Sequence, residues 1–565
     1  MLNHYQNKNM GKKVDSIFNL LIMSILLLNI SCRNENQPAD LIVTNATIWT
    51  GNTTQPWAKA MAVRNDIILA VGSQEEILKY AGDSTKVLNF KDKFVVPGFI
   101  DSHVHFLTGG FNLSSVQLRD ANTKEEFIRR IAEYAKTVKP GTWILGGDWD
   151  HTLWGGTLPD KEWIDQFTPD HPVFITRLDG HMSLANSLAM KLAGINEEIK
   201  DIDGGTIVRN SSGKLTGIFK ENAAALIENK IPSPSSEQTD KALISAMNFV
   251  ASKGVTSVHH MCGDMDALER ARDNHTLITR IYAITPIWNW KGLKEKIQKN
   301  GNGDKWLKIG GLKGFVDGSL GSHTAAMLAP FNDSPKDSGF FVNSKDSLYK
   351  WTLKGDKEGL QVMIHAIGDR AIRYLLGMYD SVAKVNGPRD RRFRIEHAQH
   401  IAPDDIARFS HLKVIPSMQP YHLIDDGRWA EKFIGPERMK TTYAFKSLVE
   451  SGATLAFGSD WFVAPPTPLE GIYAAVTRRT LDDKNPDGWV PEQKITVEQA
   501  LTAYTINGAY ASFDEKIKGT LESGKLADFV VINANLTKID PVKIRDAKIL
   551  QTWVGGKKVY DGEGK

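Results

Sequence analysis

The sequence predicts an α/β fold built on a (β/α)₈ TIM barrel, and three observations lead to that prediction. Eight short apolar segments alternate with helical patterns, which is typical of parallel βα units. Alternating, β-branched segments stand near both ends of the chain, where they can pair into one small sheet domain. About 150 residues separate the first two barrel strands, and so long a connection predicts a cap inserted between strands 1 and 2.

The predicted barrel strands end at or next to polar side chains. In a barrel of this type, reactive groups gather at the carboxyl ends of the strands. The predicted strands span residues 94–100, 254–260, 279–284, 311–317, 360–366, 392–397, 413–418 and 453–460. The site of any chemistry is therefore expected where these segments end.

The ends of the chain carry the remaining strand patterns. Segments 40–49 and 60–72 alternate in the same way as segments 527–532 and 549–560. The expected organisation is a signal peptide at 1–32, the N-terminal part of a β-sandwich at 33–93, barrel strand 1 at 94–106, the cap at 107–250, the rest of the barrel at 251–480, and a C-terminal helix with the rest of the sandwich at 481–565.

Composition excludes several classes of protein. The chain has 565 residues, of which 41% are hydrophobic and 24% charged, and its net charge is +3. It is neither disordered-like nor basic enough to predict nucleic-acid binding. Its two cysteines, Cys32 and Cys262, form neither a disulfide framework nor a zinc-finger spacing.

The N-terminus predicts export. A cluster of lysines precedes the apolar run 17–28, which is short for a spanning helix and has the form of a secretory signal core. Cys32 follows this run, and a polar stretch comes after it. The pattern resembles a bacterial lipoprotein signal, so we expect Cys32 to carry a lipid that anchors the protein to a membrane, in the periplasm or at the cell surface. A plain cleaved signal and an uncleaved anchor are the alternatives.

His103 and His105 are the first candidate metal ligands. Residues two apart on a strand project from the same face, so both imidazoles can point at one cation. With 15 histidines in the chain, chance supplies about 0.4 such pairs, so the motif is weak alone. Two buried structural histidines are the alternative. Placement at the end of an apolar strand, together with ligand-type residues on other strands, favours a metal site.

Those further residues are His365, His397 and Asp460, at the ends of the fifth, sixth and eighth predicted strands. Imidazoles from separate strands suit zinc or a similar metal. A cation lowers the pKa of bound water to about 7, so a neighbouring Asp460 is a sufficient base at neutral pH. A helix cap is the alternative role for Asp460.

Taken in order, these motifs resemble the amidohydrolase superfamily. The segments that carry the resemblance are 97–105, His365, His397, 458–460 and 519–528. Segments 178–181, 315–322 and 365–369 resemble its subgroup that contains the N-substituted formamide deformylases, amidohydrolase family 3. The resemblance spans nearly everything after residue 40. It implies a distorted (β/α)₈ barrel with a small β-sandwich from both chain ends, in agreement with the strand pattern.

The resemblance also implies a ligand set. One or two divalent metals, with zinc as the expected ion, would be held by His103, His105, His365, His397 and Asp460, and Asp460 would also shuttle protons. Many relatives bridge two metals with a carboxylated lysine on the fourth strand, and Lys313 matches that position. An ammonium beside cations is disfavoured, whereas a carbamate offers two anionic oxygens. Lys308 is a rival, and a surface or substrate-binding lysine is the other interpretation of Lys313.

Five residues are candidates for contact with the substrate. Trp149, Asp179 and His181 would line the pocket from the cap, with His181 polarising the scissile carbonyl or holding the oxyanion of the intermediate. Asp317 and Ser319 lie in a glycine-rich loop after the fourth strand and either bind substrate or shape the turn. For Trp149, Asp179 and His181 the alternative is a structural role in the cap.

The expected function is hydrolysis of carbon–nitrogen bonds other than peptide bonds by metal-activated water. The substrate would be a small molecule with an amide, N-formyl, N-acyl or cyclic amide group, and no nucleic acid partner is expected. Because fold alone does not set the substrate, hydrolysis of an ester or lactone at the same site is an alternative. A non-catalytic, lipid-anchored binding protein is the other alternative.

Overall fold

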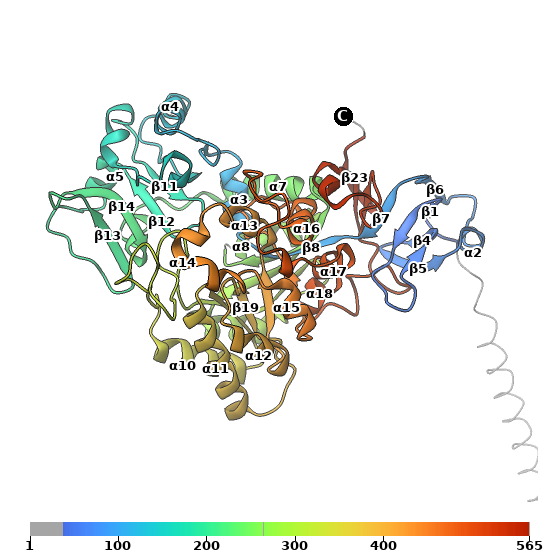
Figure 1. Ribbon diagram of the computed structural model, residues 1–565. Coiled ribbons are helices and arrows are strands. Elements are labelled where there is room, and N and C mark those ends of the chain that lie inside the picture. The colour runs from blue at the N-terminus through green and yellow to red at the C-terminus, as the bar shows by residue number, and fades with distance from the viewer. Residues whose placement is uncertain (1–37, 264, 564–565) are drawn as a thin grey trace, which may run out of the picture.

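The computed structural model describes residues 38–263 and 265–563, which form a central barrel with a cap on one side and a sandwich of sheets on the other (Figure 1). The predicted signal peptide and the lipidation site Cys32 lie outside the described residues. Among the helices of residues 38–263 and 265–563, none combines the length and the hydropathy needed to cross a membrane.

The barrel confirms the predicted fold class. Its eight strands run parallel in the order of the chain and are β8 (Phe99–Val104), β15 (Val255–Met261), β16 (Arg280–Pro286), β17 (Leu307–Phe315), β18 (Gln361–Ala366), β19 (Arg394–His397), β20 (Ile415–Met418) and β21 (Ala456–Phe457). The intervening helices include α7 (Ser236–Ser252), α8 (Met265–Asp273), α9 (Trp290–Asn300), α10 (Lys345–Lys357), α11 (Asp369–Asn386), α12 (Ile406–His411) and α15 (Phe445–Glu450). Helices α17 (Val497–Ala503) and α18 (Ile506–Ala511) follow the last strand.

Backbone hydrogen bonds tie the end of the last strand to the end of the first. The N–H of Asp460 donates to the carbonyl of His103 at 2.6 Å, and the N–H of His105 donates to the carbonyl of Trp461 at 2.6 Å. Gly458 permits this approach, because a Cβ at its position would lie 2.6 Å from the nitrogen of His103. Barrel closure therefore brings three candidate ligands from distant parts of the sequence together.

Both chain ends build the sandwich, as predicted. One sheet has the order β5-β4-β1-β6 and the other β24-β23-β22-β7-β2-β3. The strands are β1 (Leu41–Thr44), β2 (Thr47–Trp49), β3 (Trp57–Ala58), β4 (Ala60–Arg64), β5 (Ile67–Gly72), β6 (Lys86–Asn89), β7 (Phe94–Pro97), β22 (Phe529–Ile532), β23 (Ile549–Val554) and β24 (Lys557–Asp561). Val43 and Met61 share one apolar core with Phe529 and Trp553, so neither end can bury its apolar face alone.

The segment predicted as the first barrel strand, 94–100, is two strands. β7 pairs with β22 and β2 of the sandwich, and the barrel strand β8 begins only at Phe99. Gly98 stands between them, and a Cβ there would lie 2.2 Å from Oγ1 of Thr256. A continuous apolar run could not show this division, because both halves are buried and only their pairing partners differ.

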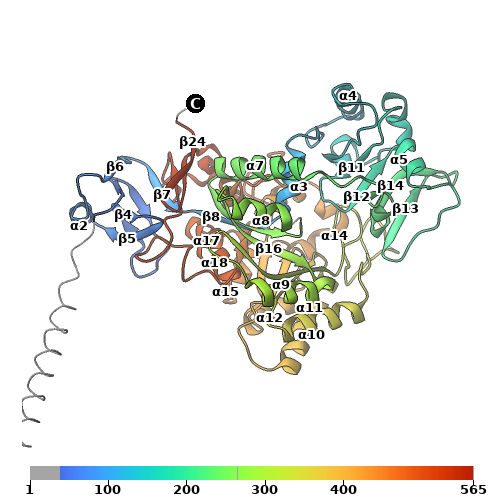
Figure 2. The same ribbon diagram turned by 180° about the vertical axis from the view of Figure 1, so that it is seen from behind.

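The cap is a six-stranded sheet of order β13-β14-β12-β11-β10-β9, on the side of the barrel away from the sandwich (Figure 2). Its strands are β9 (Val116–Gln117), β10 (Gly146–Trp149), β11 (Phe174–Arg177), β12 (Met182–Ala185), β13 (Gly205–Arg209) and β14 (Leu215–Glu221). The predicted cap segment 107–250 ends too late, because Leu243, Met247 and Val250 of α7 pack into the barrel core.

Candidate metal centre and substrate pocket

His103, His397 and Asp460 form a buried cluster at the carboxyl end of the barrel. One ligand atom from each lies within 4.8 Å of the other two. Their exposed fractions are 0%, 4% and 6%. His397 and Asp460 have left-handed backbone conformations, with φ of 71° and 60°, and such values are uncommon outside glycine and concentrate at functional sites. The chain therefore turns sharply where each of these two side chains is presented.

The cluster fits a divalent metal. Nδ1 of His397 and Oδ1 of Asp460 are buried and make no hydrogen bond within the described part of the chain. Oδ1 of Asp460 lies 3.4 Å from Nε2 of His103 and 3.3 Å from Nε2 of His105, but neither contact has hydrogen-bond geometry. Buried acceptors without partners are unfavourable, and a cation would satisfy both. Imidazole and carboxylate donors are those that zinc and similar metals take.

Two further predicted ligands lie beside this cluster. His105 stands at its open side, with a side chain 26% exposed. The ring of His365 has its centroid 4.4 Å from that of His397, and its Nε2 lies 3.1 Å from the carbonyl oxygen of Gly318. The structure thus brings together histidines from three strands and the carboxylate that follows the eighth.

Lys313 reaches the same cluster from β17. Its Nζ lies 3.2 Å from Nε2 of His103, and its side chain is buried. The rival Lys308 points elsewhere, since its Nζ donates to Oδ1 of Asp514 at 2.7 Å and to the carbonyl of Ser512 at 2.6 Å. Of the two lysines, only Lys313 is placed to meet a metal held by the cluster.

Glu396 fixes the orientation of His103. Its Oε2 lies 2.5 Å from Nδ1 of His103, so the opposite nitrogen, Nε2, faces the cluster. Arg394 donates from Nε to Oε1 of Glu396 at 2.7 Å. Burial disfavours the ionised carboxyl, but Arg394 and then His103 outweigh it and hold the pKa of Glu396 at about 2. Sequence reasoning missed Glu396, although two charged residues on one face of an apolar strand are a usable signal.

Replacing Glu396 with glutamine is expected to lower metal affinity about 10- to 100-fold, the usual effect of losing a carboxylate behind a histidine ligand. The free energy of unfolding should also fall by about 3–5 kcal/mol, because Arg394 would keep a buried charge without its partner. Chelator competition measures the first effect and urea unfolding of metal-free protein the second. Glu437→Gln, at a side chain 82% exposed, is the matched control. Unchanged metal affinity would contradict the assignment.

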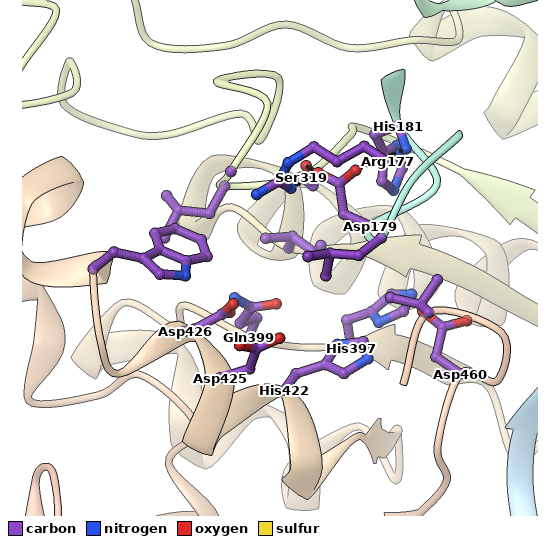
Figure 3. Close-up of a pocket in the computed structure, with 16 residues that line it drawn as sticks. Arg177, Asp179, His181, Ser319, His397, Gln399, His422, Asp425, Asp426 and Asp460 are labelled. Carbon is purple, nitrogen blue, oxygen red and sulfur yellow. Dashed lines mark hydrogen bonds and ion pairs between the residues drawn. The ribbon is translucent and has the colours of Figure 1, made fainter. Parts of the chain in front are cut away.

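A cavity opens from this cluster, and 16 residues line it (Figure 3). From the cap come Arg177, Leu178, Asp179 and His181. From the barrel loops come Ser319, Leu320, Gly321, Ile367, His397, Gln399, His422, Asp425, Asp426, Trp429, Asp460 and Val463. The cap forms one wall of this cavity, and the metal cluster lies at its edge.

Three of the predicted substrate residues, Asp179, His181 and Ser319, line this cavity. Oγ of Ser319 donates to Oδ2 of Asp179 at 2.6 Å, and NH1 of Arg177 lies 2.6 Å from the same oxygen. Burial raises the pKa of Asp179, but Arg177 and His181 outweigh it, so this pKa lies well below its usual range. Asp179 is therefore an anion that joins the cap to the barrel loop at the pocket wall.

Asp317 and Trp149 lie behind the pocket wall. Asp317 accepts backbone hydrogen bonds from Ala326, Ile367 and Gly368 at 2.8–3.0 Å, and burial raises its pKa to about 7. Trp149 is fully buried in the cap and donates from Nε1 to the carbonyl of Ile175 at 3.0 Å. The structure thus gives Asp317 a loop-ordering position and Trp149 a place in the cap core.

His181 lines the cavity, and its ring centroid is 5.1 Å from that of His365. Its Nδ1 lies 3.0 Å from Oε2 of Glu221, whose Oε1 accepts a hydrogen bond from Thr324 at 2.5 Å. Burial opposes a charge on the ring, but Glu221 outweighs it and raises the pKa of His181 to about 9. A protonated imidazole is a suitable donor to a carbonyl oxygen. Glu221 carries no pattern that would have identified it from sequence.

Known proteins resemble the chain along most of its length. Protein LONG AFTER FAR-RED 3 of Arabidopsis thaliana is 42% identical over 92% of each chain. An N-substituted formamide deformylase of Arthrobacter pascens is 26% identical, covering 94% of this chain and 99% of its own. The solved structure of an uncharacterized metal-dependent hydrolase from Pyrococcus furiosus has 29% identity and a TM-score of 0.70, covering 89% of this chain and 100% of that one.

A family profile assigns the chain to the same family that the motifs and the fold indicate. The profile described as the amidohydrolase family matches residues 86–560, which include the barrel, the cap and five of the ten sandwich strands. These findings support a metal-dependent hydrolase with a divalent metal among the histidine and aspartate residues of the cluster. The chain therefore belongs to the amidohydrolase family, as the resemblance of its motifs predicted.

Proposed function

We propose that this protein hydrolyses carbon–nitrogen bonds other than peptide bonds in small amide-type molecules, such as N-formyl, N-acyl or cyclic amides. One observation carries the proposal: Nδ1 of His397 and Oδ1 of Asp460 are buried and have no partner within the described residues, and both side chains belong to the cluster at the edge of the cavity. The deformylase among the relatives supports a carbon–nitrogen bond as the target.

In this proposal His103, His105, His365, His397 and Asp460 hold the metal, with zinc as the expected ion. A carbamate on Lys313 would allow the site to hold two ions. The bound metal supplies a Lewis acid that activates water and polarises the carbonyl.

The remaining tasks fall to side chains of this chain. Asp460 accepts the proton of the attacking water and passes it to the departing nitrogen, because it borders both the cluster and the cavity. His181, held by Glu221, donates a hydrogen bond to the carbonyl oxygen as negative charge develops there. The cap shields the reacting atoms from bulk water.

A substrate screen tests the proposal. Purified full-length protein loaded with zinc is offered N-formyl amines, N-acyl amines, cyclic amides, and esters and lactones of matched size. We expect release of amine from at least one amide class, with matched esters turned over more slowly. Hydrolysis of esters or lactones alone would contradict the choice of bond. No hydrolysis, together with no bound metal by elemental analysis, would instead favour a binding protein.

We further propose that the enzyme is exported and anchored by a lipid on Cys32, in the periplasm or at the cell surface. Cys32→Ser should move the protein from the membrane fraction to the soluble fraction of a bacterial host. Cys262→Ser is the matched control, since burial raises the pKa of that thiol to about 11 and leaves it unreactive. Mass spectrometry of the mature N-terminus should show the lipid. Membrane retention of Cys32→Ser would contradict the proposal and point to an uncleaved anchor.

A further inference from the structure

The cavity has a second polar end, opposite the metal cluster. Gln399, Asp425, Asp426 and Trp429 line it, and we call these four residues the acidic end. Figure 3 shows Gln399, Asp425 and Asp426 gathered on one side of the cavity and Asp460 on the other. Helix α13 (Pro420–Asp426) supplies both carboxylates. A substrate with its scissile bond at the cluster would extend toward this end.

Asp426 forms no ion pair with any of the described residues. Its Oδ2 accepts hydrogen bonds from Nε2 of Gln399 and from the hydroxyl of Tyr443, both at 2.6 Å. Within residues 38–263 and 265–563 both hydrogen bonds of its side chain use Oδ2, and no lysine or arginine forms an ion pair with it. Burial raises the pKa of Asp426 to about 7, and Tyr443, Arg177 and Arg428 oppose this shift only in part.

Gln399 contributes a second unsatisfied acceptor. Its side chain is 3% exposed and lines the cavity, and its only side-chain hydrogen bond in the described part of the chain uses Nε2. Its Oε1 accepts no hydrogen bond within the described residues, so it is available to an N–H group of a ligand in the cavity.

The neighbouring cations are already engaged. Arg177 pairs with Asp179 at 2.6 Å, and Arg428 pairs with Asp425. Neither guanidinium forms an ion pair with Asp426. Within the described residues Asp426 therefore has no direct ion pair, although the charges of Arg177 and Arg428 act on it from their places beside other carboxylates.

Trp429 adds an aromatic surface to the same end. Its ring packs on Phe433 with centroids 5.1 Å apart, which holds the indole in place at the cavity wall. Cations are attracted to indole faces, and a carboxylate with an amide oxygen supplies acceptors for N–H groups. A carboxylate, an amide oxygen and an indole together match an ammonium or a guanidinium.

We infer that the substrate carries a protonated amine or guanidinium a few bonds from its scissile carbon–nitrogen bond, and that Asp426, Gln399 and Trp429 bind this cation. The inference rests on the proposed function for the identity of the scissile bond, but cation binding at the acidic end can be tested separately. An anionic substituent would be repelled at this end, so the acidic end also sets which part of the molecule faces the metal cluster.

Binding of small probes provides the test. The dissociation constants of n-butylammonium, n-butylguanidinium, n-butanol and butyrate are measured by calorimetry on full-length protein. The two cations should bind about tenfold or more tightly than butanol, and butyrate more weakly than all three. Asp426→Asn should reduce this preference to about that of a neutral site. Gln399→Met, which keeps the volume and removes Oε1, should reduce it partly, and Asp83→Asn at an exposed carboxylate should leave it unchanged.

Each outcome bears on the inference. Equal binding of cation and alcohol, tighter binding of butyrate, or an undiminished preference in Asp426→Asn would overturn it. If circular dichroism shows that a variant is unfolded, the relative affinities of the four probes for wild-type protein decide the question. With N-formyl diamines and N-formyl alkylamines as substrates, the ammonium-ended member should have the higher kcat/KM. Selective cation binding without amide hydrolysis would contradict the proposed function but support the cation site. Amide hydrolysis without a preference for cations would support the proposed function but contradict the cation site.

Discussion

Replacement of Asp460 by alanine is expected to lower kcat/KM at least about 10³-fold while the protein remains folded. The variant removes a candidate metal ligand and the group that moves the proton, and proton transfer alone is worth about 10²- to 10⁴-fold. The fold should persist, because the backbone bond from Asp460 to the carbonyl of His103 does not need the side chain. Steady-state kinetics on the best substrate of the screen measures the loss.

Asp83→Ala is the control for this experiment, since Asp83 is exposed and does not line the cavity. Circular dichroism and thermal unfolding establish that both variants are folded. Activity of Asp460→Ala within about tenfold of wild type, measured at saturating zinc, would remove Asp460 from the proton path.

Removal of the metal is expected to abolish activity and to lower Tm. A ligand that binds only the folded state stabilises it by about 2.7 kcal/mol at 100 times its dissociation constant, so chelation should destabilise the protein measurably. Added zinc should restore both activity and Tm. Calorimetric unfolding and turnover, measured before and after dialysis against chelator, test this expectation.

Lys313→Ala serves as the comparison variant for metal content. If Lys313 carries a carbamate that bridges two ions, wild-type protein loaded with zinc in the presence of bicarbonate should hold two equivalents and the variant one. Elemental analysis of both proteins gives the ratio. Full activity after exhaustive removal of metal would contradict the proposed chemistry, whatever the state of Lys313.

Much of the fold could be predicted from the sequence because the barrel strands are buried on both faces and so appear as apolar runs with helical patterns between them. All eight predicted barrel segments overlap strands of the barrel. The division at Gly98 could not be predicted, because β7 and β8 are equally apolar and differ only in the strands they pair with. The extent of the cap was missed for a similar reason, since α7 is amphipathic whichever unit it packs on.

The clustering of candidate ligands could be predicted because their residue types are rare at strand ends and chemically specific, and that they bind a metal stays a prediction. His103, His397 and Asp460 come together, and Lys313 reaches them where Lys308 does not. Glu396 was missed because the charged pair that it forms with Arg394 on one strand face does not reveal that His103 lies beside them.

The acidic end could not be predicted from sequence. Gln399 follows β19, whereas Asp425 and Asp426 close a helix that shows no motif, and only tertiary structure makes them neighbours of one cavity. Trp149, by contrast, was a candidate for contact with the substrate, but in the structure it packs in the core of the cap.

The junction at Gly98 has a consequence for how the protein matures. The strand that presents His103, β8, follows β7 after the single residue Gly98. β7 pairs with β22, which lies more than 400 residues later in the chain. Contacts so distant in sequence form late in folding. Nearly the whole polypeptide must therefore be synthesised before His103 is fixed in its final place, and we expect metal to be acquired by the finished protein, after the ribosome has released the chain.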